Sequence, residues 1–302
     1  MTMREHVERV DRAKVWAACY RVTGCAADAD EVLQEAFARA VEVKPAVSAE
    51  QPLEPWILKV AVRLAIDRLR RRRDSPYDGP WLPSPIETSD EIDAPSARYE
   101  RVESATFAFL LALEALTPAQ RAVVVLRDVL DLSAAETADV LEETEDGVRA
   151  LHHRARAKLA GYDRARLRPD AAARERARAV LEMLFGHLVA GDTKSALALL
   201  ADGARLVNDA GGVYHAARRV VRGPDRIVRF YVGLLKKLGM PESFRVRELN
   251  GLPAVEMFYP ASRVGRFAPH LVTGVLLDAS DRVETIYGVL APRKLVHLRR
   301  EQ

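Results

Sequence analysis

The sequence predicts a multidomain protein in which two all-α domains are followed by an α+β domain. Apolar residues recur at helical spacing through residues 4–73 and again through 98–165. A stretch with five prolines separates these two helical parts, and long irregular connections are typical of linkers. Beyond residue 172 two helices precede segments with strand composition. We expect all-α domains at 1–75 and 98–168, a Pro-rich linker at 76–97 and an α+β domain at 172–298.

Composition and charge limit the class of protein. Of 302 residues, 49% are apolar, which suffices for a core in each domain, and the net charge is only +3. Arginines nevertheless cluster at 68–73, 149–168 and 174–178. Such blocks favour contact with a polyanion at defined faces, and an ordinary solvated surface is the alternative for each block.

Neither the cysteines nor the termini indicate a metal, a disulfide scaffold or a membrane anchor. Cys19 and Cys25 lie close together without a second pair of metal ligands, and a chain of this size does not need disulfides. The N-terminus lacks an apolar signal core, and no apolar run approaches the ~20 residues that span a bilayer. We expect a cytoplasmic protein with no membrane span, no metal and no cofactor.

Two segments of the first domain carry distinctive polar stripes. Residues 28–42 combine an apolar helical face with a mainly acidic stripe, which taken alone is typical of an ordinary surface helix. Residues 55–73 are apolar around most of the helix, leaving a narrow, mainly basic stripe that begins near Trp56. Cations that follow phosphates beside an aromatic ring suit single-stranded DNA.

The order and spacing of these segments resemble region 2 of the extracytoplasmic-function (ECF) sigma factors. The resemblance rests on Cys19–Gly24, Asp28–Phe37, Pro55–Ala61 and Asp67–Arg70. It implies that the acidic helix binds the clamp helices of RNA polymerase and that the next helix melts and reads the −10 promoter element. Arg63 stands where the family usually has Asn. The implied polymerase contacts are Asp30, Glu31, Gln34, Glu35 and Arg39, and the implied −10 contacts are Trp56, Lys59, Arg63, Arg70 and Arg71.

The second domain has the pattern of a helix-turn-helix. Capping boxes at Thr117–Gln120 and Ser133–Glu136 begin two helices, and Thr144 can cap a third helix that runs through Leu159. The last helix is basic, which favours DNA binding, although a helical hairpin without a DNA role has the same pattern.

Residues Leu116–Val123, Glu136–Ala138, Val148–Arg149 and His153–Arg156 resemble region 4 of the same family. This resemblance implies that the last helix enters the major groove of the −35 element. Two departures stand out: Glu142 replaces a usual Gly, and Leu151-His152 replaces Arg-Leu, which removes one DNA contact and makes His152 a core histidine. The implied −35 contacts are Arg149, His153, Arg154 and Arg156.

The last part of the chain predicts a helix pair, 174–190 and 193–200, followed by a curved sheet. The expected strands are 204–208, 254–259, 270–277 and 282–290. This order resembles the SnoaL-like cone that a subgroup of ECF sigma factors carries at the C-terminus. The matching segments are Asn208–Gly212, Val221–Arg226, Val228–Phe230, Asn250–Ala254 and Ala291–Leu295, with Trp81–Pro85 in the linker.

In that subgroup these segments connect the third domain with the promoter domains. Several charged or glycine positions differ here, since Ser84, Ala210, Val213, Ala291 and Arg293 replace the usual residues. Prolines keep the linker extended, and its Trp and Leu offer apolar anchors. We therefore expect the linker to pack on the third domain. The expected interdomain residues are Trp81, Leu82, Pro83, Asp209, Gly211, Gly212, Pro292, Lys294 and Leu295.

The leading hypothesis is a non-catalytic sigma factor whose partners are core RNA polymerase and promoter DNA and whose third domain modulates activity. One alternative is a SnoaL-type cyclase or isomerase with a DNA-binding appendage. Its candidate catalytic residues, Asp209, His215 and His270, share no diagnostic spacing, and Asp209 reads as a turn residue. The other alternative is a helix-turn-helix repressor. A pocket ligand of the third domain stays unidentified.

Overall fold

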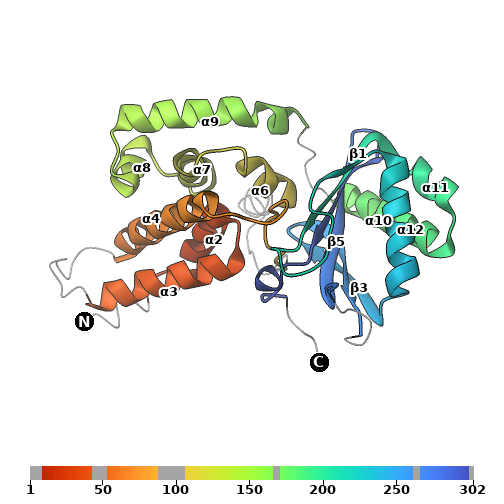
Figure 1. Ribbon diagram of the computed structural model, residues 1–302. Helices are drawn as coiled ribbons and strands as arrows, with labels where there is room; N and C mark the ends of the chain where they lie inside the picture. Colours follow the sequence, from red (N-terminus) through yellow and green to blue (C-terminus); the bar gives the residue numbers. More distant parts are fainter. Residues whose placement is uncertain (1–8, 43–52, 88–105, 166–170, 261–265, 299–302) are drawn as a thin grey trace. The chain divides into compact units, whose positions relative to one another are not determined.

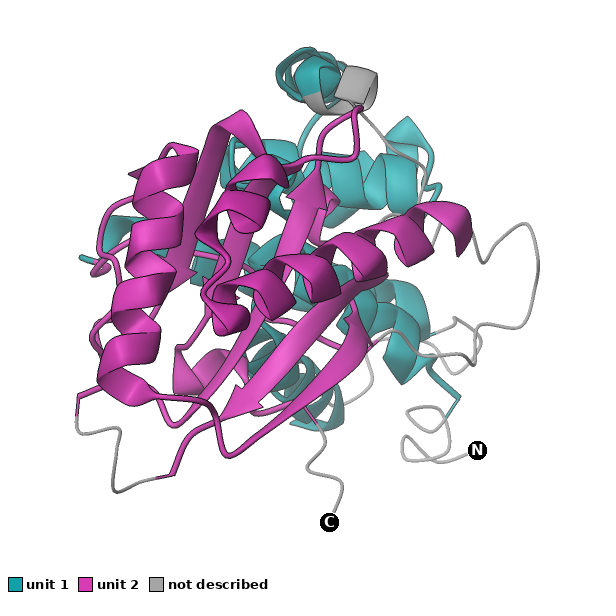
Figure 2. Cartoon of the chain, turned by 90° about the vertical axis from the view of Figure 1, so that its right-hand side faces the viewer, with its two compact units in different colours: residues 1–76, 110–164 teal, residues 77–109, 165–302 magenta. Residues whose placement is uncertain are grey.

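The computed structural model describes residues 9–42, 53–87, 106–165, 171–260 and 266–298. The chain divides into two compact units, which are coloured separately in Figure 2. Unit 1 comprises residues 1–76 and 110–164, and unit 2 comprises residues 77–109 and 165–302. The described part of the expected linker, residues 77–87, therefore belongs to unit 2. Residues 88–105 and 166–170, which include the rest of that linker, lie outside the described residues.

Three helices that pack on one another form the first part of unit 1 (Figure 1). They are α2 (Arg12–Thr23), α3 (Ala26–Glu42) and α4 (Leu53–Asp74). Gly24 ends α2 in the left-handed conformation with φ 69°, and its N–H bonds the carbonyl of Tyr20. The apolar side chains of α4 are buried over most of its length, as its sequence predicts.

The rest of unit 1 contains the helix-turn-helix. Both predicted capping boxes are formed: Thr117 begins α7 (Pro118–Val124), and Ser133 begins α8 (Ala134–Leu141). A π-helical turn, Val125–Val129, follows α7. The basic helix α9 extends over Glu145–Ala165. The short helix α6 (Phe107–Leu113) has its first three residues in unit 2 and the others in unit 1. Glu142 ends α8 with a positive φ of 55°, a conformation that a glycine adopts more readily.

Unit 2 is built on a six-stranded sheet with the order β2-β1-β6-β5-β4-β3. Strands β1 and β6 are parallel, and the other neighbours are antiparallel. Helices α10 (Ala171–Ala190), α11 (Thr193–Ala198) and α12 (Pro224–Leu238) cover one face of the sheet (Figures 1 and 2). The strands are β1 (Leu200–Asp209), β2 (Val221–Arg222), β3 (Ser243–Leu249), β4 (Leu252–Phe258), β5 (His270–Leu277) and β6 (Val283–Val289).

The predicted fold class is confirmed, with helical parts followed by an α+β domain. The four predicted strands correspond to β1, β4, β5 and β6. Three elements were missed: α12, β2 and β3. Helix α12 begins at Pro224 directly after a glycine, and β3 carries Arg245, Arg247 and Glu248, which obscure strand composition.

Candidate functional site

The predicted polymerase stripe lies along the outer side of α3. Glu31, Gln34 and Arg39 are exposed, whereas Asp30 and Glu35 are half-buried. The indole of Trp16 donates to Asp30 (2.7 Å), so this carboxylate also holds α2 against α3. Glu31 pairs with Arg68 of α4, and Glu35 pairs with Arg39 one turn away (2.6 Å). The structure thus brings the five residues together on one helix face.

The basic stripe of α4 faces carboxylates of α8 within unit 1. Lys59 Nζ lies 2.9 Å from Asp139, and Arg63 forms a two-pronged ion pair with Glu142. Trp56 is half-buried, and Arg70 and Arg71 are exposed. Each exposed pair contributes about 0–1 kcal/mol and is weakened by salt. Two of the five predicted −10 residues, Lys59 and Arg63, are therefore paired with carboxylates that a polyanion could displace.

The Arg63–Glu142 pair joins one departure from the expected family pattern in each helical part. Glu142 adopts the left-handed conformation, which is unfavourable for a residue with a side chain. Its carboxylate there meets both terminal nitrogens of Arg63. The two positions, noticed separately in the sequence, are therefore neighbours in the fold.

The basic face of α9 has a mixed environment. His153 and Arg154 are exposed, and Arg149 pairs with Glu145 (2.6 Å) and Asp146 (2.7 Å) in its own helix. Arg156 lies 3.5 Å from Asp128. The expectation that His152 is a core residue was wrong: it is half-buried, and its Nε2 lies 2.6 Å from Asp128, which gives the ring a polar partner.

A buried ion cluster in unit 1 was missed from the sequence. Arg121 is fully buried, donates to the carbonyl of Arg21 (2.8 Å) and pairs with Glu114. Arg72 also contacts Glu114 (2.7 Å) and the carbonyl of Thr23 (2.7 Å). Burial lowers the pKa of Arg72, and the Glu114 carboxylate opposes that shift. One carboxylate therefore balances two buried cations that come from α4 and α7.

The linker site of unit 2 is centred on Asp209. This residue is not a simple turn residue, because its carboxylate is buried and takes part in several contacts. It accepts from the N–H of Leu82 (2.7 Å), from the hydroxyl of Tyr77 (2.5 Å) and from the N–H of Gly211 (3.1 Å), and it pairs with Lys294. The Lys294 ammonium also donates to the carbonyl of Leu82.

Trp81 completes this site. Its ring lies over the Lys294 ammonium, with 3.7 Å between the nitrogen and the ring centre, which is cation–π geometry. Leu82 and Pro83 are buried, and Leu295 is buried beside the short 3₁₀-helix (Pro292–Lys294) that carries the lysine. The linker residues 81–83 and the segments 209–212 and 292–295 therefore meet, as the sequence led us to expect.

The glycines of this site admit the linker at close range. Gly211 and Gly212 have positive φ values of 58° and 74°. A Cβ at Gly211 would lie 3.2 Å from Ala291, and one at Gly212 would lie 3.2 Å from Asp78. The loop thus combines left-handed backbone with close contact to the linker.

A second anchor holds the end of the described linker. Ile86 forms two hydrogen bonds with Asn250: its N–H donates to the side-chain oxygen of Asn250 (3.1 Å), and its carbonyl accepts from the backbone N–H of Asn250 (2.9 Å). Asn250 and Gly251 form the β3–β4 turn with positive φ values. Glu87 pairs with Arg247, which in turn contacts the buried Glu256 at 2.8 Å. Sequence reasoning noticed the turn but not this contact.

The three candidate catalytic residues do not converge. Asp209 is bound to the linker, and His270 Nε2 lies 2.8 Å from Glu256. Of the three, only His215 lines an apolar cavity that lies between the helices and the sheet of unit 2. In the described residues no group of three His, Cys, Asp or Glu side chains is placed to hold a metal ion. The described helices also include none long and apolar enough to cross a membrane.

Comparison with known proteins assigns the two helical parts. The family Sigma-70 region 2 matches residues 9–75, and the family Sigma-70, region 4 matches residues 106–159. The ECF RNA polymerase sigma factor SigJ of Mycobacterium tuberculosis is 34% identical over 248 residues, which is 79% of this chain and 75% of SigJ. This chain belongs to the ECF RNA polymerase sigma factors. Like other sigma factors, it binds core RNA polymerase and promoter DNA and directs transcription.

The similarity to ECF sigma factors extends over the third domain. The "Probable ECF RNA polymerase sigma factor SigI" of Mycobacterium tuberculosis is 27% identical over 298 residues, covering 97% of this chain and 95% of that protein. The crystal structure of Mycobacterium tuberculosis SigJ aligns with a TM-score of 0.71 and 29% identity, covering 95% of this chain and 97% of that one. The fold of SigJ therefore matches nearly the whole of this chain.

Proposed function

We propose that this sigma factor uses the α3 stripe for core polymerase, the α4 stripe for the −10 element and the α9 face for the −35 element. The third domain acts without catalysis by holding the linker. The buried pair between Asp209 and Lys294 supports this role most strongly. The two charged groups contact each other, and both also hydrogen-bond the backbone of Leu82 in the linker.

The pairing of Lys59 and Arg63 with α8 supports a closed free form. Both cations must leave their carboxylate partners before they can hold phosphates. Polymerase and promoter therefore bind an open form, and the equilibrium between the two forms sets promoter activity. The linker joins the two promoter-binding parts of the chain, so its docking on the third domain limits how far they can separate.

For the polymerase contact, we expect the double variant Glu31→Lys/Glu35→Lys to weaken assembly with core polymerase by roughly tenfold or more. Reversed charges at an interface oppose binding, whereas exposed helix positions change stability little. Affinity is measured by fluorescence anisotropy with labelled sigma factor. Glu175→Lys/Glu284→Lys, on α10 and β6, is the matched control, because both residues are exposed. Unchanged affinity of the α3 variant would refute this surface.

For the −35 contact, we expect Arg149→Ala and Arg154→Ala each to reduce open-complex formation at a −35-dependent promoter. A lost base-reading arginine costs about 1–3 kcal/mol and relaxes preference at one position, whereas a lost phosphate contact weakens all sequences alike. Promoter variants with a substituted −35 element distinguish the two cases. Arg178→Ala, exposed on α10, is the control. Wild-type open-complex levels for both α9 variants would place the recognition face elsewhere.

For the linker, we expect Trp81→Ala to change promoter activity in the full-length chain. It should have little further effect in a chain that ends near residue 170, because that chain lacks Lys294 and Asp209. Run-off transcription with core polymerase measures both. Equal effects of Trp81→Ala in the two backgrounds would mean that Trp81 acts within the promoter-binding parts, independently of the third domain.

A further inference from the structure

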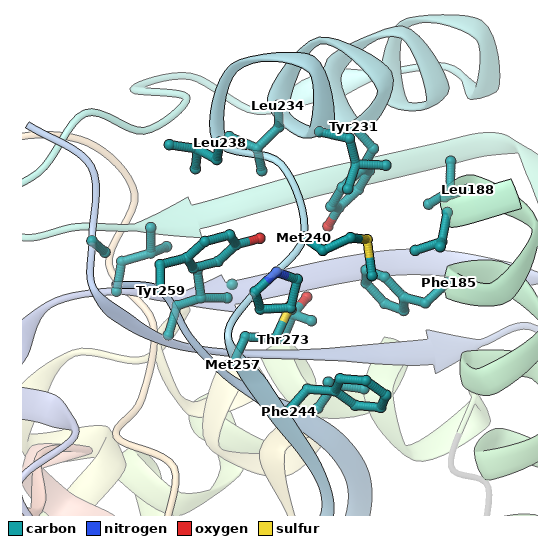
Figure 3. Close-up of a pocket in the computed structure, with 18 of the residues that line it drawn as sticks. Phe185, Leu188, Tyr231, Leu234, Leu238, Met240, Phe244, Met257, Tyr259 and Thr273 are labelled. Carbon is teal, nitrogen blue, oxygen red and sulfur yellow. The ribbon is translucent and has the colours of Figure 1, made fainter. Parts of the chain in front are cut away.

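Unit 2 encloses a cavity of about 340 Å³ between its helices and its sheet. Ligand sites in proteins span roughly 300–1,000 Å³, so this cavity has the size of a small-molecule site. Its walls come from α10, α12 and strands β3 to β6. Figure 3 shows side chains from these elements, among them Phe185, Leu188, Leu234 and Met257, arranged around a common space.

The mouth of the cavity is unusually apolar for a protein surface. Three lining residues expose large fractions of their apolar side chains: Val189 (50%), Met240 (45%) and Phe244 (61%). They come from α10, the α12–β3 connection and β3. Apolar groups gathered at the entrance of an apolar cavity mark a binding site rather than scattered surface residues.

A few polar groups lie within this apolar wall. Tyr231 is buried and hydrogen-bonds Thr273, and burial raises the pKa values of both Tyr231 and Tyr259. Figure 3 shows the hydroxyl groups of the two tyrosines directed toward the centre of the labelled residues. Asn208 and His215 also line the cavity. Neutral donors and acceptors in an apolar wall orient a ligand through its own hydroxyl or carbonyl group.

The described lining offers little to balance a charge. It includes no lysine, arginine or aspartate, and its one glutamate, Glu182, is exposed on α10. Moving an unpaired ion from water into such a wall is strongly unfavourable. The site therefore favours a neutral ligand over its ionised counterpart.

We infer that this cavity is a receptor site for an uncharged, mostly apolar small molecule that carries a hydroxyl or carbonyl group, and that its occupancy acts on the linker. The sensing part rests on the proposed role of the linker, whereas the binding part does not.

Strand β1 carries the effect from the cavity to the linker. Asn208 lines the cavity, and the next residue, Asp209, holds Leu82 and Lys294. Successive side chains of a strand point to opposite faces, so the side chains of these two residues lie on opposite sides of the sheet. Leu290, which also lines the cavity, donates its N–H to the carbonyl of Asp209 (2.7 Å). A ligand that displaces Asn208 or Leu290 therefore acts directly on the residue that holds the linker.

The binding test uses the full chain and the neutral dye Nile red, with 1-decanol and decanoate as competitors. We expect saturable dye binding, displacement by decanol, and much weaker displacement by decanoate. Phe244→Asp, which adds a charge at the mouth, should weaken dye affinity by roughly tenfold. Met183→Asp is the matched control, because Met183 is similarly exposed on α10 and does not line the cavity.

A buried variant supplies a second test of location. Ala268→Phe should fill the cavity and abolish binding, and circular dichroism checks its fold. The site is refuted if the wild-type chain binds no dye saturably, or if Phe244→Asp and Met183→Asp bind it equally. A preference for decanoate over decanol would overturn the neutral-ligand assignment.

The sensing test follows tryptophan emission while decanol is added. We expect a change in the wild-type chain that is lost in Trp81→Phe, because Trp81 stacks on Lys294 at the linker site. If decanol displaces the dye but causes no emission change that depends on Trp81, the proposed effect of the ligand on the linker is refuted. The result on ligand binding would still stand. Failure of the linker's proposed role in transcription would be seen separately, in the run-off assay.

Discussion

Replacing Lys294 with methionine should destabilise unit 2 by about 3–5 kcal/mol, because the Asp209 carboxylate then stays buried without its cation. The same change removes the ammonium that Trp81 covers and the donor to the Leu82 carbonyl. We expect the linker to leave the third domain, which would shift the emission of Trp81 toward that of an exposed indole. Urea denaturation followed by tryptophan fluorescence measures both effects.

The double variant Asp209→Asn/Lys294→Met separates charge from shape. Removing both charges avoids the uncompensated carboxylate, so the double variant should recover much of the lost stability. Lys236→Met on α12 is the control for a lysine outside the linker site. A single variant as stable as the wild type, with unchanged Trp81 emission, would contradict the role assigned to this pair.

Replacing Glu114 with glutamine should destabilise unit 1 by a similar ~3–5 kcal/mol. Glu114 balances both Arg121, which is fully buried, and Arg72, which is mostly buried. Glutamine keeps the shape but leaves two neighbouring cations without a counter-charge. Because these arginines belong to α4 and α7, we also expect the helix-turn-helix part to separate more readily from the first three helices.

Urea denaturation monitored by circular dichroism measures the loss of stability in Glu114→Gln. Glu143→Gln is the matched control, because Glu143 is exposed near the end of α8. The variant Glu114→Gln/Arg121→Met removes one of the two cations and should be more stable than Glu114→Gln alone. Equal stability of Glu114→Gln and its control would show that the cluster carries no net stabilisation.

Local signals predicted the helical parts well. The capping boxes of Thr117 and Ser133 depend on residues three positions apart, and both are formed. The π-helical turn after α7 was missed because it has no capping box of its own. Helix α12 was missed although Pro224 at its first position and Asp225 in its first turn are start signals, because no side chain caps it at Gly223. β3 was missed although Phe244-Arg245-Val246-Arg247 alternates apolar and polar residues, because the alternation is short and Glu248 interrupts it before Leu249.

The contacts that make up the candidate sites depend on residues far apart in the sequence. Asp209 lies 127 positions from Leu82 and 85 from Lys294. The resemblance to ECF sigma factors predicted that these segments take part in the same interdomain contact. No periodicity in the sequence could show that one carboxylate joins them. The same holds for Arg63 and Glu142, 79 positions apart, and for the cavity, whose wall is assembled from helices and strands.

Transcription in vitro with purified core polymerase tests the central claim that this chain is a sigma factor. A promoter is first mapped from transcripts that rise when the chain is overproduced. Core polymerase with the full-length chain should then give one start site on that promoter, lost when the −10 or −35 element is scrambled. The contradicting result is sequence-specific binding to closed duplex DNA by the chain alone, with no promoter-specific transcript when core polymerase is added.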